Sequence, residues 1–472
     1  MLYDIKDLEN ALKDDLVYID ENYDFSIDNV VFDNREVQGN SMFISRKGEK
    51  NDGHRFIADT LKNNKSAVVL AEYLPKDVKQ DPRIILVKNT MKAFENLAIF
   101  SRRRLQGHVI GITGSVGKTS TKDSMFYCLS DFGKSFCNIH SFNNHIGVLT
   151  TLVNTPKDTE FAIYEMGMNT YGEMDVLREL VKPEIAVILN VKSAHIGNFK
   201  SEEEIAIEKS KITDNSTKIT ILNLDSRWFK LLRKKVGSIS TFGTNGTADV
   251  ILSKHIVDGN IAEVEYVANG KTYVCKLNNL DHNIAYNAMA IVAVAKYLGL
   301  DIDRILQKLT TFDTSRGRNN IEYANYDFNG KNVNLTIING SYNAANPETF
   351  VTGLKLMDNI YKQNKNRRKV CIFGDILEAG EKSVEFHLSL KQHILDSNIQ
   401  LLITTGDYMK MLSESLDGHD LQLLHVSDIT LLTDSIKNYL EDKDLVFIKS
   451  SKGIGTYKVL NQLVGEEMKV FT

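Results

Sequence analysis

Short apolar or β-branched runs alternate with helical patterns along most of the chain. Such alternation is typical of α/β proteins with parallel sheets. In the first hundred residues the pattern predicts short strands at Asn29–Phe32, Ser41–Ser45, Ala67–Glu72 and Arg83–Val87. A helix is predicted over Thr90–Ser101, and the basic run Arg102–Arg104 that follows it is interpreted as a linker with solvated side chains.

A second unit begins with a buried strand at His108–Ile112, followed by a glycine-rich turn and a helix that opens at Lys118. Further strands are predicted at Phe161–Glu165, Ile185–Val191 and Lys218–Leu222. A β-rich insertion over residues 238–277 and a helix over Asn283–Leu298 complete this unit.

The polar, turn-like segment Asp313–Asn320 indicates a second boundary. Beyond it, helical patterns separate strands predicted at Leu335–Ile338, Val370–Phe373, Leu401–Thr404 and Leu445–Lys449. This order is typical of a doubly wound domain. We therefore expect an α/β protein of three domains: an N-terminal domain at 1–103, a central parallel-sheet domain at 104–315 and a C-terminal Rossmann-like domain at 316–472.

Composition narrows the classes of function. The 472 residues include 42% hydrophobic residues, which is enough for each domain to have its own core. A formal net charge of −4 disfavours nucleic-acid binding, because phosphate contacts need an excess of Lys and Arg. The sequence has no apolar run close to the roughly 18 residues of a membrane span, no secretory signal pattern, and four widely spaced cysteines. We expect a cytoplasmic monomer that does not insert into a membrane.

The most specific motif is Gly111-Ile-Thr-Gly114-Ser-Val-Gly117-Lys118-Thr119. Glycines let successive backbone N–H groups turn toward one anion, and the helix N-terminus adds its positive end. Lys118 can then reach terminal phosphates and the Thr119 hydroxyl can bind Mg²⁺. Ile112 stands where the strict pattern has its first glycine, so a chance Gly-Lys-Thr in a glycine-rich turn is the alternative. The order strand, loop, helix favours a phosphate-binding loop.

Two residues at neighbouring strand ends could complete a metal site. Glu165 closes a predicted strand, and His195 lies just beyond the next one. A carboxylate at that edge can hold the cation that bridges terminal phosphates. Taken alone, each has an ordinary alternative, since a strand-end Glu is more often a cap and a single His is more often simply hydrogen-bonded.

These motifs resemble the Mur ligases, ATP-dependent enzymes that extend the peptide of bacterial cell-wall precursors. The order and spacing of that family are matched by Gly111–Thr119, Tyr164-Glu165-Met-Gly167, Asn190–His195 and Lys209. The resemblance extends over essentially the whole chain and is closest to the branch that adds D-alanyl-D-alanine. That branch is indicated by Asp33-Asn34-Arg35, by residues 47–56, by residues 141–148, by Ser341-Tyr342-Asn343 and by residues 373–381.

The resemblance implies a set of site residues. It implies that the first domain binds the uridine nucleotide end of the substrate through Asp33, Arg35, Lys47, Gly48 and His54. It implies that ATP is bound by Gly114, Ser115, Gly117, Lys118, Thr119, Ser120, His282, Asn283, Asn287 and Arg318. Further substrate contacts would come from Asn143, Asn144, Tyr342 and Asn343, and Mg²⁺ ligands from Thr119, Glu165, His195 and Lys209. Lys118, Lys209, His195 and Arg318 would be the catalytic residues. From the residues alone, exposed loop positions and ordinary helix capping remain open for the first-domain set and for His282–Asn287.

Lys209 lies in an acidic helical run, where by itself it is an ordinary surface cation. In the family the matching lysine is carbamylated by CO₂, which would turn this cation into a carboxylate-like anion and a support for a second Mg²⁺. The sequence departs from the family at Asn34, at Asn339 and Gly340, which replace paired aspartates, and at one additional alanine before Asn346. These changes remove acidic groups on the third domain near the expected nucleotide.

The implied activity is ATP-dependent amide bond formation through an acyl phosphate, joining D-alanyl-D-alanine to UDP-N-acetylmuramoyl-tripeptide in peptidoglycan precursor synthesis. The main alternative is a related ligase that joins another amino acid or dipeptide to another carboxylate outside the cell-wall pathway. A family member that binds nucleotide without turnover is disfavoured by the presence of Lys118, Glu165 and Lys209. A mechanical P-loop ATPase or GTPase is disfavoured by the flanking domains. The third residue of the tripeptide is left open.

Overall fold

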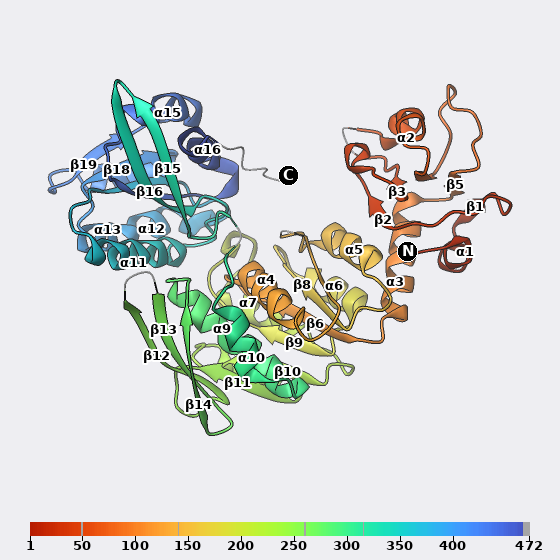
Figure 1. Cartoon of the computed structure of the whole chain (residues 1–472), viewed down its shortest axis with the longest axis horizontal. Coiled ribbons are helices and arrows are strands. Elements are labelled where there is room, and N and C mark those ends of the chain that lie inside the picture. Colours follow the sequence, from red (N-terminus) through yellow and green to blue (C-terminus); the bar gives the residue numbers. More distant parts are fainter. Residues whose placement is uncertain (49–50, 140, 259–260, 315, 466–472) are drawn as a thin grey trace.

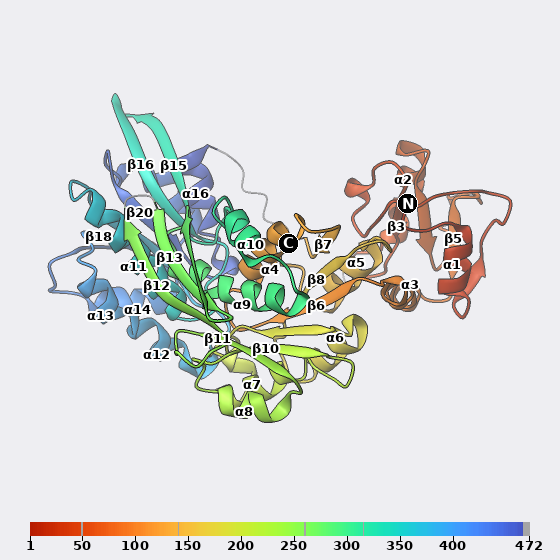
Figure 2. The same ribbon diagram turned by 60° about the horizontal axis from the view of Figure 1, so that its bottom comes forward.

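The computed structural model describes residues 1–48, 51–139, 141–258, 261–314 and 316–465. These residues contain three sheets that follow one another along the chain and correspond to three domains (Figure 1). The first domain projects to one side, while the third lies against the second (Figure 2). The predicted α/β architecture is confirmed. The boundaries at 103/104 and 315/316 stay predictions, and position 315 lies outside the described residues, as do positions 49–50 within the segment 47–56.

The first domain has a five-stranded sheet in the order β1-β5-β4-β3-β2, in which β2 to β5 are parallel and β1 is antiparallel to β5. Its strands are β1 (Leu16–Tyr18), β2 (Asn29–Val31), β3 (Ser41–Ile44), β4 (Val68–Ala71) and β5 (Ile84–Val87). Its helices are α1 (Ile5–Leu12), α2 (Ile57–Asn63) and α3 (Thr90–Arg104).

The basic run Arg102–Arg104 is the last turn of α3, so the predicted linker is wrong. Arg102 donates from Nε to the carbonyl of Val181 (2.5 Å) and from Nη2 to that of Lys182 (2.9 Å), at the C-terminal end of a helix in the second domain. Arg104 pairs with Asp7 at 2.9 Å. Cations are favoured at helix C-termini, where carbonyl groups lack partners. Two of the three arginines therefore make specific contacts within and between the first two domains.

The second domain has a nine-stranded sheet in the order β14-β13-β12-β11-β10-β9-β6-β8-β7. The strands are β6 (His108–Thr113), β7 (Ser135–Cys137), β8 (Phe161–Glu165), β9 (Ile185–Ile188), β10 (Ile219–Asn223), β11 (Ile239–Gly243), β12 (Val250–Asp258), β13 (Ile261–Ala268) and β14 (Lys271–Leu277). The helices are α4 (Lys118–Leu129), α5 (His145–Asn154), α6 (Glu173–Val181), α7 (Glu202–Ser210), α8 (Phe229–Lys235), α9 (His282–Leu298) and α10 (Ile302–Leu309).

The β-rich segment expected as an insertion is part of this sheet. Strand β11 pairs in parallel with β10, β12 pairs in parallel with β11, and β13 and β14 continue as an antiparallel meander. Helices α4, α9 and α10 pack on one face of the sheet and α6, α7 and α8 lie toward the other (Figure 2). Positions 259–260, between β12 and β13, lie outside the described residues.

The third domain has a six-stranded sheet in the order β15-β16-β20-β17-β18-β19. The strands are β15 (Asn320–Phe328), β16 (Lys331–Gly340), β17 (Lys369–Gly374), β18 (Leu401–Thr405), β19 (Gln422–His425) and β20 (Leu445–Lys449). The helices are α11 (Glu348–Gln363), α12 (Ser383–Leu388), α13 (Leu390–Asp396), α14 (Asp407–Ser415), α15 (Ile429–Ser435) and α16 (Tyr457–Val464). Helices α11, α12 and α13 lie on the side of the second domain (Figure 1).

Four strands of this domain match the prediction, whereas β15 and β19 were missed. β15 is an edge strand that pairs antiparallel with β16, and β19 is the opposite edge, parallel to β18. Edge strands are half exposed and therefore lack the continuous apolar run of a central strand. Among the described helices, none combines the length and the apolarity needed to cross a bilayer.

Candidate active site between the second and third domains

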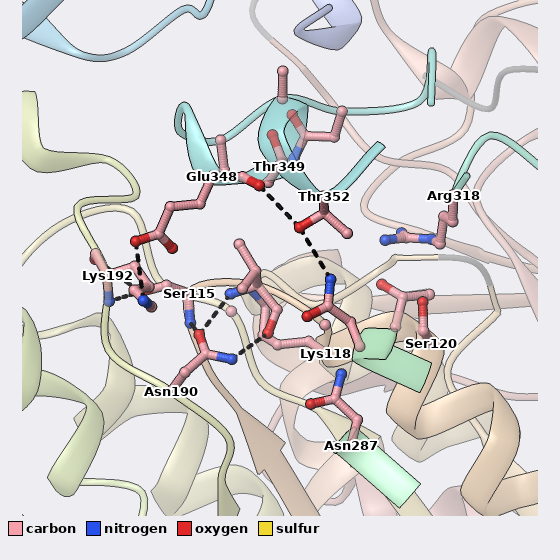
Figure 3. A pocket seen from close by; sticks show the side chains of 18 of the residues that line it. Ser115, Lys118, Ser120, Asn190, Lys192, Asn287, Arg318, Glu348, Thr349 and Thr352 are labelled. Carbon is pink, nitrogen blue, oxygen red and sulfur yellow. Dashed lines mark hydrogen bonds and ion pairs between the residues drawn. The ribbon is translucent and has the colours of Figure 1, made fainter. Parts of the chain in front are cut away.

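Strand ends of the second and third domains face each other across a cavity of about 1000 Å³. Residues that follow β6, β8 and β9 line it from the second domain, and residues that follow β16, β17 and β20 line it from the third. The carboxyl ends of parallel strands are the usual place for ligands in such sheets. The close-up in Figure 3 shows that side chains from both domains point into this space.

The glycine-rich loop enters the cavity at the start of α4. Gly117 is the N-cap of this helix and has φ of +83°. A Cβ at this position would lie 2.5 Å from the Asn287 Nδ2. Because Gly117 has no side chain, Asn287 of α9 can pack directly against the loop. Only glycine combines this backbone conformation with such a close approach. The predicted strand, loop and helix are confirmed, with α4 beginning at Lys118.

The loop is held from the side by Asn190, which follows β9. Its Oδ1 accepts hydrogen bonds from the backbone N–H groups of Ser115 (3.1 Å) and Val116 (3.0 Å), and its Nδ2 donates to the Val116 carbonyl (2.9 Å) (Figure 3). The Ser115 hydroxyl donates to the carbonyl of Lys192 at 2.9 Å. β9 ends at Ile188, three residues earlier than predicted, because the chain leaves the sheet here to reach the loop.

Lys118 is the first residue of α4 and lines the cavity. Its Nζ donates to the carbonyl of Gly114 at 2.8 Å. Burial lowers the pKa of this ammonium group, Glu165 raises it and Arg318 lowers it. No carboxylate of the described residues is bonded to Lys118. An incoming anion would therefore meet a desolvated positive charge.

Glu165, at the end of β8, is bonded to two neutral groups from different segments. It accepts from the Thr119 hydroxyl at 2.7 Å and from the Asn143 amide at 2.6 Å, and the residue is 1% exposed. Behind it, Asn138 accepts from the Glu165 backbone N–H at 2.5 Å, and the buried Lys122 donates to the Asn138 carbonyl at 2.6 Å. Thr119 and Glu165, both predicted as metal ligands, are therefore adjacent and hydrogen-bonded to each other. The residues that support Glu165 from behind were not predicted from the sequence.

His195 lines the same cavity and adopts φ of +57°. Its Nδ1 is 2.5 Å from an Oε2 of Glu378 in the third domain. The pKa of this imidazole is lowered by burial and by Lys118, and raised by the bond to Glu378. The ring nitrogen left for a ligand is Nε2.

Lys209 is buried on α7, 4% exposed, next to the cavity but not on its surface. Burial lowers its pKa well below the ordinary lysine value, repulsion from Lys118 lowers it further, and Glu208 raises it. Burial of this side chain contradicts the reading of Lys209 as a solvated helix-face cation.

The described residues contain no group of three or more His, Cys, Asp or Glu side chains arranged to hold a metal. Glu165 and His195 supply two such side chains in the cavity, and Thr119 adds a hydroxyl. A buried carboxylate bonded to a hydroxyl and an amide is an oxygen donor set that fits Mg²⁺, which keeps several ligands from water and phosphate. The residues present therefore fit a partly protein-coordinated cation.

The start of α9 forms another wall of the cavity, with His282, Asn283 and Asn287 lining it as predicted. Asn283 donates from Nδ2 to the Thr352 hydroxyl at 3.2 Å, which connects α9 to α11 of the third domain (Figure 3). Nearby, the Tyr286 hydroxyl donates to Asp225 at 2.8 Å. Asp225 and Tyr286 also line the cavity and were not singled out from the sequence.

The third domain contributes a cationic wall. The Arg318 guanidinium lies 4.7 Å from the ring centroid of Tyr342, whose hydroxyl is hydrogen-bonded to Ser141 of the second domain. Lys449, at the end of β20, donates to the carbonyl of Asn343 at 2.7 Å. Burial and Arg318 lower the pKa of Lys449 to about 7, against a raising effect of Asp281.

The departures at Asn339 and Gly340 have a structural reason. Asn339 is fully buried, donates to Glu322 at 2.6 Å and accepts from the Ser341 hydroxyl at 2.7 Å. A Cβ on Gly340 would lie 2.8 Å from the Asn319 Oδ1. Neither residue lines the cavity. In place of the paired aspartates of the family pattern, these positions belong to a hydrogen-bond network inside the third domain.

Besides Gly114 and Lys209, six predicted residues do not line this cavity. Asn144 caps α5 by accepting from the Gly147 N–H at 2.9 Å. His54 is 1% exposed, with Nδ1 bonded to Asp52 at 2.7 Å and Nε2 accepting from the Glu72 N–H at 3.0 Å, so its side chain supports a loop. The others are exposed or half-exposed positions of the first domain: Asp33, Arg35, Lys47 and Gly48.

Comparisons with known proteins agree with this architecture. Residues 112–295 match the family model described as the Mur ligase middle domain. UDP-N-acetylmuramoyl-tripeptide--D-alanyl-D-alanine ligase from Synechocystis is 30% identical over 452 residues, covering 94% of this chain and 93% of that protein. The enzyme of the same name from Rickettsia prowazekii is 29% identical over 442 residues, covering 92% of this chain and 94% of that protein.

Solved structures give the same result. The MurF ligase from Thermotoga maritima, in complex with ADP, superposes with a TM-score of 0.74 at 25% identity and covers 93% of this chain and 97% of that one. A crystal structure of MurF from Acinetobacter baumannii has a TM-score of 0.79 at 23% identity, with 98% of each chain covered, and shares the fold. The fold and the phosphate-binding loop define an α/β ligase of three domains. The chain belongs to the Mur ligase family.

Proposed function

We propose that this protein is the ATP-dependent ligase that joins D-alanyl-D-alanine to UDP-N-acetylmuramoyl-tripeptide, in the cytoplasmic synthesis of peptidoglycan precursors. The observation that carries this proposal is the convergence of the loop lysine Lys118, the Thr119–Glu165 pair and the cationic third-domain residue Arg318 on one cavity. The full-length similarity to enzymes of that name supports the choice of substrates.

In the first half of the reaction a substrate carboxylate attacks the γ-phosphorus of ATP, forming an acyl phosphate and breaking the bond to ADP. Lys118 and the N–H groups at the start of α4 face the charge that develops on the transferring phosphoryl group. Arg318 approaches from the third domain with a second positive charge. These groups are held in place before the reaction by Asn190 and by the Tyr342 ring, so little reorganisation is needed.

The proposed cation would be held by Thr119, Glu165 and His195, with Lys209 as a further ligand after carbamylation. When bound, Mg²⁺ neutralises phosphate charge and polarises the phosphoryl oxygens. Asn143 and Asn138 fix the Glu165 carboxylate and backbone, so that the acidic group keeps its direction toward the loop.

In the second half a neutral amine attacks the acyl carbonyl, and inorganic phosphate leaves from the tetrahedral intermediate. The mechanism needs no nucleophilic side chain, because phosphate already activates the carboxylate. Contacts across the cavity, such as Asn283 with Thr352 and Ser141 with Tyr342, close the third domain over this space. Closure excludes water, which would otherwise hydrolyse the acyl phosphate.

The uridine nucleotide end of the substrate is proposed to contact the first domain. Asp33 and Arg35 form an ion pair just beyond the end of β2, and the Arg35 side chain is 84% exposed. Lys47 follows β3 at the same edge of the parallel sheet and is also exposed. Exposed cations at this edge can meet phosphate groups, while His54 supports the loop from beneath.

The proposal is tested by a substrate panel. Purified protein with ATP and Mg²⁺ is expected to release phosphate only when UDP-N-acetylmuramoyl-tripeptide and D-alanyl-D-alanine are both present, with one phosphate for each amide formed. The panel varies the third residue of the tripeptide and replaces the amine by single amino acids and other dipeptides. Faster turnover with another acceptor and amine would reassign the protein to a related ligase outside this pathway.

Gly117 provides a test of the loop itself. Gly117→Ala is expected to weaken ADP binding at least tenfold, because the methyl group must displace the Asn287 amide, and to lower the free energy of unfolding by about 1–2 kcal/mol through the positive φ. The matched control is Gly172→Ala, at the N-cap of α6, with φ of +92° and an open space for the methyl group. Calorimetric titration with ADP and thermal unfolding should show that the control loses stability but keeps the ADP affinity of the wild type. Equal ADP affinity in both variants would remove Gly117 from the binding site.

A further inference from the structure

The segment between β17 and α12 reaches from the third domain to the loop that carries His195. Glu378 lies in this segment, its Oε2 is 2.5 Å from the His195 Nδ1, and the Gly197 N–H donates to the Glu378 carbonyl at 3.4 Å. The segment is anchored in its own domain, since the Leu377 N–H donates to the Ser451 hydroxyl at 2.9 Å. The carboxylate is thus presented across the domain interface by a fixed backbone.

The two backbones approach closely because both carry glycine at the contact. A Cβ on Gly380 would lie 2.8 Å from the Cα of Gly197, and a Cβ on Gly197 would lie 3.0 Å from the N of Gly380. Gly380 has φ of +57°. A side chain at either position would force the two segments apart.

His195 depends on an outside partner for its orientation. It has φ of +57°, a region that residues other than glycine rarely adopt, and it precedes a single short turn, Ile196–Asn198. A hydrogen bond from Nδ1 to Glu378 selects the tautomer and leaves Nε2 as the ring nitrogen available to a ligand. Histidines that bind metals commonly donate their other ring nitrogen to a carboxylate, which fixes the ring and raises its basicity.

We infer that Glu378 is a positioning residue for His195, and that closure of the third domain completes the cation site of the second. The inference rests on the cation site proposed above. The carboxylate and the imidazole belong to different domains, so closure raises the affinity for the cation. By reciprocity, the bound cation favours closure by the same factor. Cation binding and water exclusion are thereby coupled through one hydrogen bond.

The test measures binding of Mn²⁺, as a probe for Mg²⁺, to the full-length protein in the presence of ADP, with free Mn²⁺ followed by electron paramagnetic resonance. Glu378→Ala is expected to weaken Mn²⁺ binding by about tenfold or more, the usual effect of removing such a partner. Glu378→Gln, whose amide oxygen still accepts from Nδ1, is expected to recover most of the affinity. Because the Glu378 side chain is 58% exposed, both variants should unfold at the wild-type temperature.

Two matched controls separate orientation from general effects. Glu381→Ala removes an exposed carboxylate from the same segment without touching His195. Glu348→Ala breaks another ion pair between these domains, from Glu348 to Lys192 at 3.0 Å, and the Glu348 side chain is 57% exposed, close to the 58% of Glu378. Both should bind Mn²⁺ within twofold of the wild type. Gly380→Ala, which separates the two backbones and leaves the carboxylate in place, should weaken binding as Glu378→Ala does.

Wild-type Mn²⁺ affinity in Glu378→Ala would overturn the inference. A loss of Mn²⁺ affinity in Glu348→Ala as large as that in Glu378→Ala would also overturn it, because that loss would come from weaker closure alone. A Glu378→Gln variant as weak as Glu378→Ala would exclude orientation by the hydrogen bond. The cation site itself is checked separately with Glu165→Ala. If the wild type shows no Mn²⁺ binding that depends on Glu165, the proposed cation site fails together with the inference.

Discussion

Replacement of Lys118 by alanine is expected to abolish phosphate release from ATP, with a loss of about a thousandfold or more. Removing one preorganised donor to developing charge typically costs a hundredfold to a thousandfold in rate. The cost should be at the upper end of this range, because Lys118 is desolvated and, within the described part of the chain, its Nζ donates to the Gly114 carbonyl and not to a carboxylate. The measurement is phosphate release with both substrates at saturation, together with ADP affinity.

Two features make this prediction specific. The fold should persist, since removing a buried cation with a lowered pKa also removes its desolvation cost, so thermal unfolding is expected at or above the wild-type temperature. Lys230→Ala on α8, outside the cavity, changes the net charge equally and should keep full activity. Near-normal turnover in Lys118→Ala would remove the glycine-rich loop from the mechanism.

The sequence was sufficient for those parts of the site that are local in the chain. The first example is a contiguous segment, formed by the strand His108–Thr113, the loop and the helix from Lys118. The glycine spacing, together with the change from strand-like to helix-like spacing of hydrophobic residues, predicts these three elements together. Glu165 and His195 could be placed because carboxyl ends of parallel strands share one edge. The alternative for Glu165 was a capping role, but its carboxylate accepts hydrogen bonds from the side chains of Thr119 and Asn143.

The supporting residues could not be predicted, because their partners are far away in the sequence. Asn190 holds a loop 75 residues earlier, Asn138 holds Glu165 at a separation of 27, and Glu378 meets His195 at a separation of 183. Each is an ordinary polar residue in an irregular segment. Nothing in local composition distinguishes an asparagine that binds backbone from one that faces water.

The wrong prediction at Arg102–Arg104 has a related cause. A run of basic residues is usually solvated, and local pattern cannot reveal that the carbonyls at the end of α6 lie opposite Arg102. The β-rich segment from β11 to β14 was detected as strands, but its continuity with the central sheet depends on the pairing of β10 with β11. Pairing partners, unlike strand propensity, are a tertiary property.

The second large effect on activity is expected from replacement of Lys209, whose amine is buried. Carbamylation joins the neutral Nζ to the carbon of CO₂ and releases one proton, so only the unprotonated lysine reacts. Burial and repulsion by Lys118 lower the pKa of Lys209 well below its ordinary value, which raises the neutral fraction at physiological pH. The product is an anion, which converts the repulsion from Lys118 into attraction. We therefore expect the carbamate to form at Lys209.

Lys209→Ala is expected to lose about a thousandfold in phosphate release, and short carboxylic acids such as acetate should restore part of the activity by occupying the space of the carbamate. In the wild type, carbamate formation should decrease as the pH falls, because protonation of Nζ competes with CO₂, and added bicarbonate should restore it. The direct measurement is carbon-13 NMR of protein incubated with labelled bicarbonate.

Lys211 is the matched control for this experiment. It lies two residues further along the chain, and its ion pairs with Asp175 and Glu208, at 2.8 Å each, raise its pKa, so it stays a charged ammonium. Lys211→Ala should leave the carbamate signal unchanged, while Lys209→Ala should remove it. Wild-type activity in the plain Lys209→Ala variant, without added acid, would show that the buried amine at this position does not support the cation. In that case Glu165, His195 and the Thr119 hydroxyl alone, with phosphate oxygens and water, would have to complete its coordination.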